Sequence, residues 1–138
     1  MPNSSLNEKI ESAIAAVLVA GSVTTTIYKG TVPEETPTPK IEVVVDGGEE
    51  IEIGTGIFRK AVQVRVTTQV DEIDDRGAIV SSVSALLQVD GVESDLTADQ
   101  SDFHVYQFED KGTQPEEEGR LKSEVLNFEI VATQKDLV

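Results

Sequence analysis

The only histidine of the chain is the first residue whose type could do chemistry. His104 lies beside Tyr106 and Phe108 in an apolar stretch. A histidine acts in catalysis when it activates a nucleophile and a third group orients its ring. The sequence has no nucleophile-elbow motif, and no nucleophile or orienting acid stands at a recognisable spacing from His104. We therefore expect a structural histidine.

A cluster of four carboxylates, Asp71, Glu72, Asp74 and Asp75, could in principle bind calcium. It lacks the D-x-D-x-D-G spacing that places several oxygens around one ion. The cluster directly precedes an apolar stripe of helical period, where carboxylates cap free backbone N–H groups and meet the positive end of the helix. The sequence therefore predicts helix capping here and no metal site.

Two further motifs are weak. Gly54-Thr55-Gly56 has no third glycine and precedes a strand, which is the wrong order for a dinucleotide or phosphate loop. Glu116-Glu117-Glu118 is a charge run of the kind that is usually solvated. These patterns together predict no catalytic residue, no cofactor and no metal, and so a protein that is not an enzyme.

The charge of the chain restricts its partners. Its 138 residues include 26 acidic and 11 basic side chains, for a net charge of −15, and no cysteine. The size predicts a single domain, residues 1–138. Direct nucleic-acid binding needs a basic stripe, and anionic membranes attract basic segments, so both partners are disfavoured. The acidic surface either serves solubility or repels polyanions.

The central unit of the fold is predicted between Phe58 and Val89. From Arg59 to Val70 apolar β-branched residues alternate with polar ones, which is typical of a strand with one buried face. Ile79, Val83, Leu86 and Leu87 then follow one stripe of a helix. A strand that leads directly into an amphipathic helix indicates a helix packed on a sheet.

The remaining segments complete this unit. A capping box at Ser5–Glu8 begins a helix that ends at Gly21. Three prolines make residues 32–39 a flexible loop or arm. The other predictions are a short strand at 24–28, a strand at 41–45 closed by a tight turn at 46–48, a short return strand at 51–53, a polar acidic segment at 90–102, a strand at 103–108, an exposed acidic hairpin connection at 109–119 and a closing strand at 121–133.

Consecutive strands linked by hairpins predict an antiparallel sheet, and the two helices must bury their apolar stripes on it. The predicted fold class is α+β, with an antiparallel β-sheet of about four to five strands and two helices packed on one face.

The order of these elements resembles the tail-terminator and tail-completion (head–tail joining) proteins of long-tailed bacteriophages. The resemblance spans Leu6 to about Thr133. Its main pieces are Pro37-Thr38-Pro39 before the strand 41–45, the strand 62–66 before the helix 79–87, and the closing strand 126–130.

The resemblance implies a structural virion protein that forms a ring, often a hexamer, at the top of the tail. Such a ring caps the tail tube and offers the surface on which the head docks. The implied partners are other copies of the chain and the tail tube protein, with sheath and head-connector proteins as further candidates. DNA passes the ring without specific binding, no membrane is involved, and assembly takes place in the cytoplasm of the bacterial host.

In a ring, two groups of residues acquire roles. The Pro-rich arm is predicted to contact a neighbouring subunit, and carboxylates are predicted to line the channel and repel DNA. The alternatives are a soluble, non-enzymatic binding or regulatory module and another structural component of a virion or contractile apparatus. The candidate contact residues are Val32, Pro33, Pro37 and Pro39, and the candidate channel residues are Asp71, Asp74, Asp75, Glu116, Glu117 and Glu118.

Overall fold

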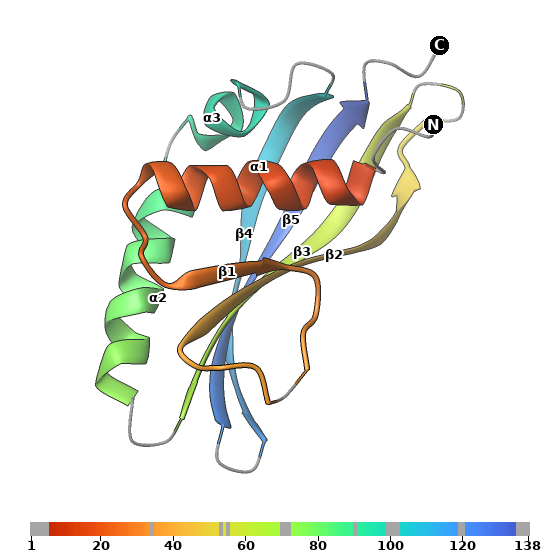
Figure 1. Ribbon diagram of the computed structural model, residues 1–138. Coiled ribbons are helices and arrows are strands. Elements are labelled where there is room, and N and C mark those ends of the chain that lie inside the picture. The colour runs from red at the N-terminus through yellow and green to blue at the C-terminus, as the bar shows by residue number, and fades with distance from the viewer. Residues whose placement is uncertain are drawn as a thin grey trace.

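A computed structural model describes residues 6–33, 35–52, 54, 56–69, 73–89, 91–98, 103–118 and 121–134. The elements follow the chain in the order shown in Figure 1. They are α1 (Leu6–Ala20), β1 (Thr26–Lys29), β2 (Lys40–Glu50), β3 (Ile57–Gln69), α2 (Ile73–Leu87), α3 (Val92–Ala98), β4 (Phe103–Glu118) and β5 (Leu121–Gln134).

The strands form one five-stranded sheet in the order β1-β2-β3-β5-β4. The predicted α+β class is confirmed, but the sheet is mixed because β1 pairs with β2 in parallel. The Pro-rich segment between these strands returns the chain to the end of the sheet at which β1 began, so β2 runs in the same direction as β1. All other pairings are antiparallel.

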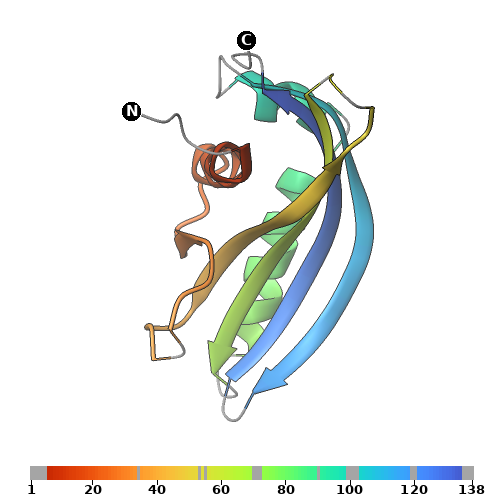
Figure 2. The ribbon, with the colours of Figure 1, turned by 90° about the vertical axis from the view of Figure 1, so that its right-hand side faces the viewer.

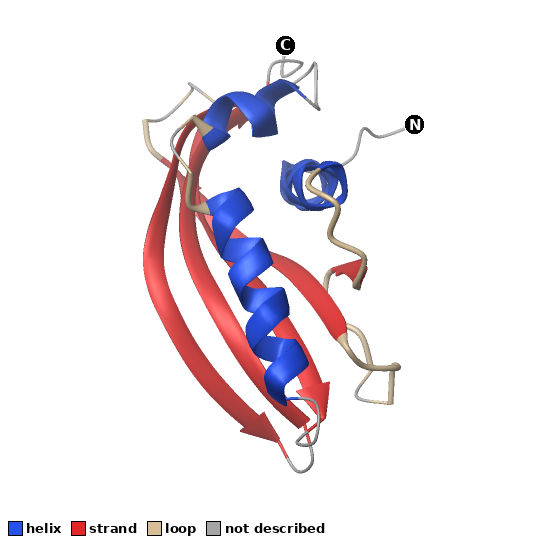
Figure 3. Ribbon diagram, turned by 90° about the vertical axis from the view of Figure 1, so that its left-hand side faces the viewer, coloured by secondary structure: helices blue, strands red, loops and turns tan. Residues whose placement is uncertain are grey.

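The helices cover one face of the sheet. Figure 2 shows the sheet curved around α1, and Figure 3 shows α2 and α3 on this same concave side. The inward side chains of β3 and β5 meet in register, with Val62 opposite Phe128 and Val64 opposite Leu126. These four residues are buried in one hydrophobic cluster that also contains residues from all three helices. The alternation in the sequence therefore predicted the buried face correctly.

The third helix, α3, was not predicted. It has only seven residues, too few to display a repeated apolar stripe. Val92 and Leu96 stand four positions apart, so they share one face of the helix, and both are buried in the core. The segment that its polar composition marked as an acidic connection is thus a short helix fixed by two apolar side chains.

Gly21 ends α1 as predicted, and a neighbouring side chain also occupies the space beside it. The left-handed backbone conformation after the helix belongs to Ser22, with φ of 69°. A Cβ atom at Gly21 would instead collide with the side chain of Leu86 on α2. The glycine lets the end of α1 approach α2 closely.

The tight turn predicted at Asp46-Gly47-Gly48 is wrong. β2 continues to Glu50, and the register shifts between Val45 and Gly48, which forms a β-bulge. The chain reverses later, where the Ile51 N–H donates to the Ile57 carbonyl at 2.7 Å, so β3 itself is the return strand. The bulge brings the backbone of Gly48 so close to β3 that a side chain there would collide with it.

The segment predicted as an exposed hairpin connection at 109–119 is mostly exposed over residues 109–117, but these residues form a strand and not a loop. β4 runs through to Glu118 and pairs with β5 along its length. The register shifts once at Tyr106 and once at Lys111. β4 is an edge strand, where a proline such as Pro115 and a glycine such as Gly112 are tolerated and charges discourage further pairing. The acidic side chains therefore stand on a rigid strand.

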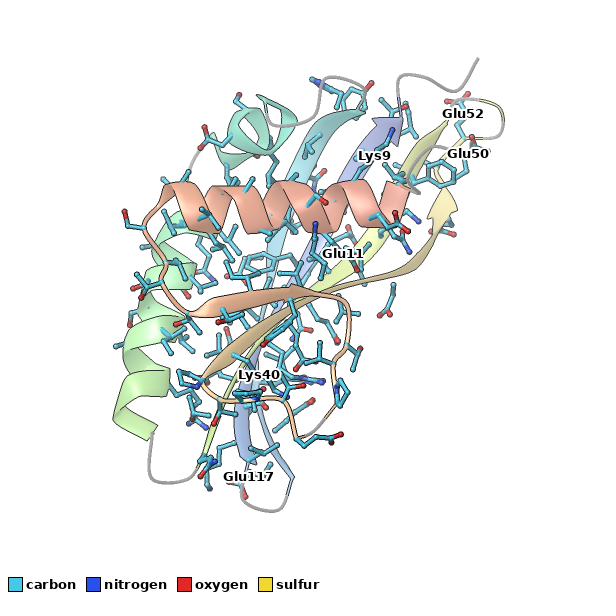
Figure 4. The ribbon with its side chains drawn as sticks, viewed as in Figure 1. Lys9, Glu11, Lys40, Glu50, Glu52 and Glu117 are labelled. Carbon is cyan, nitrogen blue, oxygen red and sulfur yellow. The ribbon has the colours of Figure 1, made fainter. Side chains whose placement is uncertain are left out.

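Two polar side chains of α1 bind the free edge of β2 beyond the end of β1. The Asn7 side-chain amide donates to the Val45 carbonyl at 3.2 Å, and the Val45 N–H donates to Glu11 Oε2 at 3.3 Å. Glu11 lies under α1 toward the strands in Figure 4. Burial raises the pKa of Glu11 above its usual value of 4.5, although the hydrogen bond from Val45 acts in the opposite direction.

The bulge makes Gly48 the sensitive glycine of β2. A Cβ atom at Gly48 would collide with the Arg59 carbonyl oxygen, a backbone atom that cannot move aside, whereas one at Gly47 meets nothing. We expect Gly48→Ala to lower the free energy of unfolding by about 1–3 kcal/mol. Gly47→Ala is the matched control and should be neutral or slightly stabilising. Equal denaturation midpoints for the two variants would show that the bulge is misplaced.

The raised pKa of Glu11 predicts a pH-dependent stability. The fold disfavours the charged form of Glu11. The contribution of protonated Glu11 to the free energy of unfolding is therefore fully present below the pKa that Glu11 has in the unfolded chain, and it is lost as pH rises through the pKa of the folded protein. Glu11→Gln should therefore raise Tm at neutral pH and have little effect well below pH 4.5, since glutamine can still accept the bond from Val45. Thermal melts of both proteins across pH 3–8 check this, and a lower Tm of the variant at neutral pH would contradict it.

Candidate functional site

A row of four polar side chains crosses the sheet on the face opposite the helices. Lys40 of β2 stands opposite Thr67 of β3, Thr67 opposite Ser123 of β5, and Ser123 opposite Glu116 of β4. Successive side chains of a strand point to opposite faces. These four residues therefore lie on the face opposite to the one that carries the buried valines of β3. The next row on this face places Glu42 opposite Arg65.

Most of this polar group is buried. Lys40, Glu42 and Thr67 are each 3% exposed. The Thr67 and Ser123 hydroxyls form a hydrogen bond of 2.8 Å across β3 and β5. Buried charges and hydroxyls are costly without partners, so the contacts of each member show what this group does.

The base of the Pro-rich arm supplies two of these contacts. The Val32 N–H donates to Glu42 Oε2 at 2.9 Å, and Lys40 Nζ donates to the Pro33 carbonyl at 3.3 Å. Pro33 also accepts the Thr36 N–H at 3.0 Å, which turns the arm back on itself. Val32 and Pro33 are thus held against the sheet by two buried charged side chains.

The outer part of the arm is more accessible. Pro37 is exposed, and Pro39 is half-buried after a cis peptide bond with Thr38. The predicted contact residues therefore separate into two sets, of which Val32 and Pro33 fix the arm within the subunit. Pro37 is free to meet another molecule.

Arg65 connects the arm side of this face to the acidic strand β4. Its guanidinium NH2 donates to both carboxylate oxygens of Glu116, at 2.9 and 3.1 Å. Arg65 Nε is enclosed and has no hydrogen-bond partner within the described part of the chain. Lys40 and Arg65 each therefore keep at least one N–H group that donates to no described protein atom.

These residues surround a cavity. It has a volume of about 220 Å³ and is lined on the arm side by Thr31 and Val32. A second, shallower hollow of about 500 Å³ adjoins it through Arg65 and Ser123 and reaches Glu116 and Glu117. The remaining lining residues of the inner cavity are Lys40, Glu42, Arg65, Thr67, Leu121 and Ser123.

The predicted channel residues are partly neutralised. Glu116 is paired with Arg65, and Glu117 accepts from Lys122, whose hydrogen bond holds the pKa of Glu117 below its usual value. Asp74 and Asp75 lie in the first turn of α2, and Glu118 ends β4, but their side chains, like the whole of Asp71, lie outside the described residues.

The two predicted groups, arm and carboxylates, come together at one end of the molecule. Gln69 at the end of β3 pairs with Leu121, which also pairs with Glu118, and α2 begins four residues after β3. Figure 4 shows Lys40 and Glu117 toward this end, with Glu50 and Glu52 at the other. Spacing along the chain could not reveal this meeting, because the arm precedes β2 whereas Glu116 and Glu117 lie far along the chain, near the end of β4.

The inner members of this cluster were missed at the sequence level. The alternation did place Arg65 and Thr67 on the polar side of β3, but a polar strand side is normally solvated. The usable signal was weak: Lys40 and Glu42 are charged residues that flank Ile41, directly before the apolar run Val43-Val44-Val45.

The histidine of the chain, His104, lies on β4. The His104 ring makes an edge-to-face contact with Tyr106, with ring centroids 4.5 Å apart. No group of three or more metal-ligating side chains occurs in the part of the chain that the structure describes. No described helix is long and apolar enough to span a membrane.

A separate apolar groove of about 610 Å³ lies between the end of α1 and α2. Small side chains line it, because Gly21 and the alanines of both helices leave room between the backbones. It carries no charged pair and lies on the helical side of the sheet, away from the polar cluster. Its lining residues are Ala16, Val17, Ala20, Gly21, Ala85, Leu86, Val89 and Asp95.

Comparison with known proteins gives a likeness of fold. No family model and no curated protein matches this chain. Among solved structures, a chain from the virion of a native gene transfer agent particle superposes with a TM-score of 0.57 at 16% sequence identity. The match covers 94% of this chain and 95% of that one. The chain therefore shares its fold, over almost the full length of both chains, with a chain of a gene transfer agent virion.

Proposed function

We propose that this protein is a structural component of a phage-like virion, and within it a tail-terminator ring, commonly a hexamer. The ring caps the tail tube and gives the head its docking surface. Its partners are other copies of itself, the tail tube protein and head-connector proteins.

One observation carries the proposal. The fold is shared, over almost the full length of both chains, with a chain of a gene transfer agent virion. The order of elements along the sequence independently resembles tail-terminator proteins. Within the described residues the polar cluster contains cations, carboxylates and hydroxyls but no activated nucleophile, which favours assembly over turnover.

The arm and the end of β4 are the proposed contact elements. Both lie at the same end of the sheet, and the arm is anchored at its base by Glu42 and Lys40. An anchored base with an exposed tip costs less entropy on binding than a free loop, since only the tip remains to be ordered. Pro37, with its fixed φ, stiffens that tip further.

The acidic end is proposed to face the channel through which DNA passes. Carboxylates repel phosphates over a screening length of about 8 Å at physiological salt. Glu116 and Glu117 contribute less than their formal charges because Arg65 and Lys122 neutralise them. The proposed repulsion therefore rests more on Glu118 and on Asp71, Asp74 and Asp75, together with the net charge of −15.

Oligomeric state tests the ring. We expect light scattering after size-exclusion chromatography to give a closed oligomer, and electron micrographs to show rings. Deleting residues 34–38 should weaken the oligomer while each subunit stays folded, because shortening a loop costs little stability. Thr113→Ala, at an exposed position of β4, is the control and should leave the oligomer unchanged. A folded, stable monomer at high concentration would reject the ring and favour a soluble binding module.

Charge reversal tests the channel. Replacing Glu117 and Glu118 by lysine should leave the ring assembled but make it bind DNA, with affinity that falls as salt rises. The control replaces Glu49 and Glu109, which are exposed acids on β2 and β4, by lysine and changes the net charge by the same amount. Equal DNA binding by both double variants would mean that Glu117 and Glu118 do not line a channel.

A further inference from the structure

The inner cavity on the open face contains cations that lack sufficient partners. Lys40 is 3% exposed, yet its ammonium makes one hydrogen bond within the described residues, to a carbonyl 3.3 Å away. No described carboxylate lies within 4.0 Å of it. Arg65 Nε is enclosed without any acceptor among the same residues. A buried ammonium normally has a charged partner or several hydrogen-bond acceptors, because removing an ion from water costs free energy.

The cavity between these two cations is built for a small polar guest. Its volume of about 220 Å³ equals roughly seven waters at their liquid volume. The Thr67 and Ser123 hydroxyls add hydrogen-bonding groups to its wall, and the arm residues Thr31 and Val32 enclose it. A guest would thus meet one ammonium, one guanidinium edge and two hydroxyls.

The charge of the surroundings selects the guest. Lys40 and Arg65 supply two positive charges, while Glu42 and Glu116 supply two negative ones. A doubly charged phosphate would add excess negative charge beside two carboxylates. A single carboxylate fits better, because it is planar, carries one charge and can accept from an arginine edge and an ammonium together.

We propose that this cavity is a carboxylate-binding site, with Lys40 and Arg65 as its binding residues, and with one further donor from the hydrogen-bonded hydroxyl pair of Thr67 and Ser123. The carboxylate comes either from a small free acid or from an acidic side chain of a second copy of this acidic chain. The site is independent of the proposed place in a virion, because a folded single subunit contains all of it.

Binding of acetate tests the site directly. At constant ionic strength with chloride as reference, sodium acetate at ten times its dissociation constant should raise Tm of the full-length protein by about 3–6 °C. Lys40→Met should abolish this rise, and Lys40→Arg, which keeps the charge, should retain part of it. Lys122→Met is the matched control, because Lys122 is paired with Glu117 outside the inner cavity, and it should respond as the unaltered protein does.

Self-association distinguishes the two sources. If the carboxylate belongs to a second copy, Lys40→Met should reduce association at least tenfold, and acetate should compete with association in the unaltered protein. If it is a free acid, acetate should raise Tm without changing the oligomeric state. Should Lys40→Met fail to fold, Arg65→Gln replaces it in both measurements. The proposal would be rejected if acetate left Tm unchanged and if self-association did not depend on Lys40 or Arg65. The cavity would then hold only water.

Discussion

The structure depends on one constraint in β3. Its side chains alternate between the two faces of the sheet, and its backbone is paired with a neighbouring strand along both edges. Since β3 lies between β2 and β5, its register with each is fixed along most of its length. A slip of one residue would turn Val62, Val64 and Val66 away from the helices. The polar row on the open face follows from this register, and the buried valines lie on the side of the sheet that curves around α1 (Figure 2).

The same period creates the polar cluster. Side chains that alternate with the buried valines must point to the open face, and antiparallel pairing places those of four strands in one row. The open face would ordinarily be solvated, but the arm folds over it and buries Lys40 and Glu42. Because buried charges need partners, the position of the arm and the state of the cavity are physically coupled: whatever displaces the arm also exposes Lys40.

This coupling joins the two proposals at one place in the molecule. The end of the sheet that bears the arm, Glu116 and Glu117 would face a neighbour or the channel of a ring, and the inner cavity opens beside it. Many of the acidic side chains that the structure describes are exposed, but Arg65 and Lys122 hold specific carboxylates in place. The more exposed pair, Lys122 with Glu117, adds little stability, and both pairs fix the direction in which the acidic strand presents its side chains.

By itself, the sequence determined the elements whose period is long and regular. The stripe of α1, the helix after β3, the buried alternation of β3 and the inward face of β5 all agree with the structure, because each repeats over several turns or residue pairs. Tertiary structure decided what repetition cannot express. The short helix α3 needed a core for Val92 and Leu96, the bulge at Gly48 needed β3 beside it, and β4 reached Glu118 only because β5 pairs with it. The cluster of Lys40, Arg65, Thr67 and Ser123 exists only across strands, since their proximity is a property of register and not of chain distance.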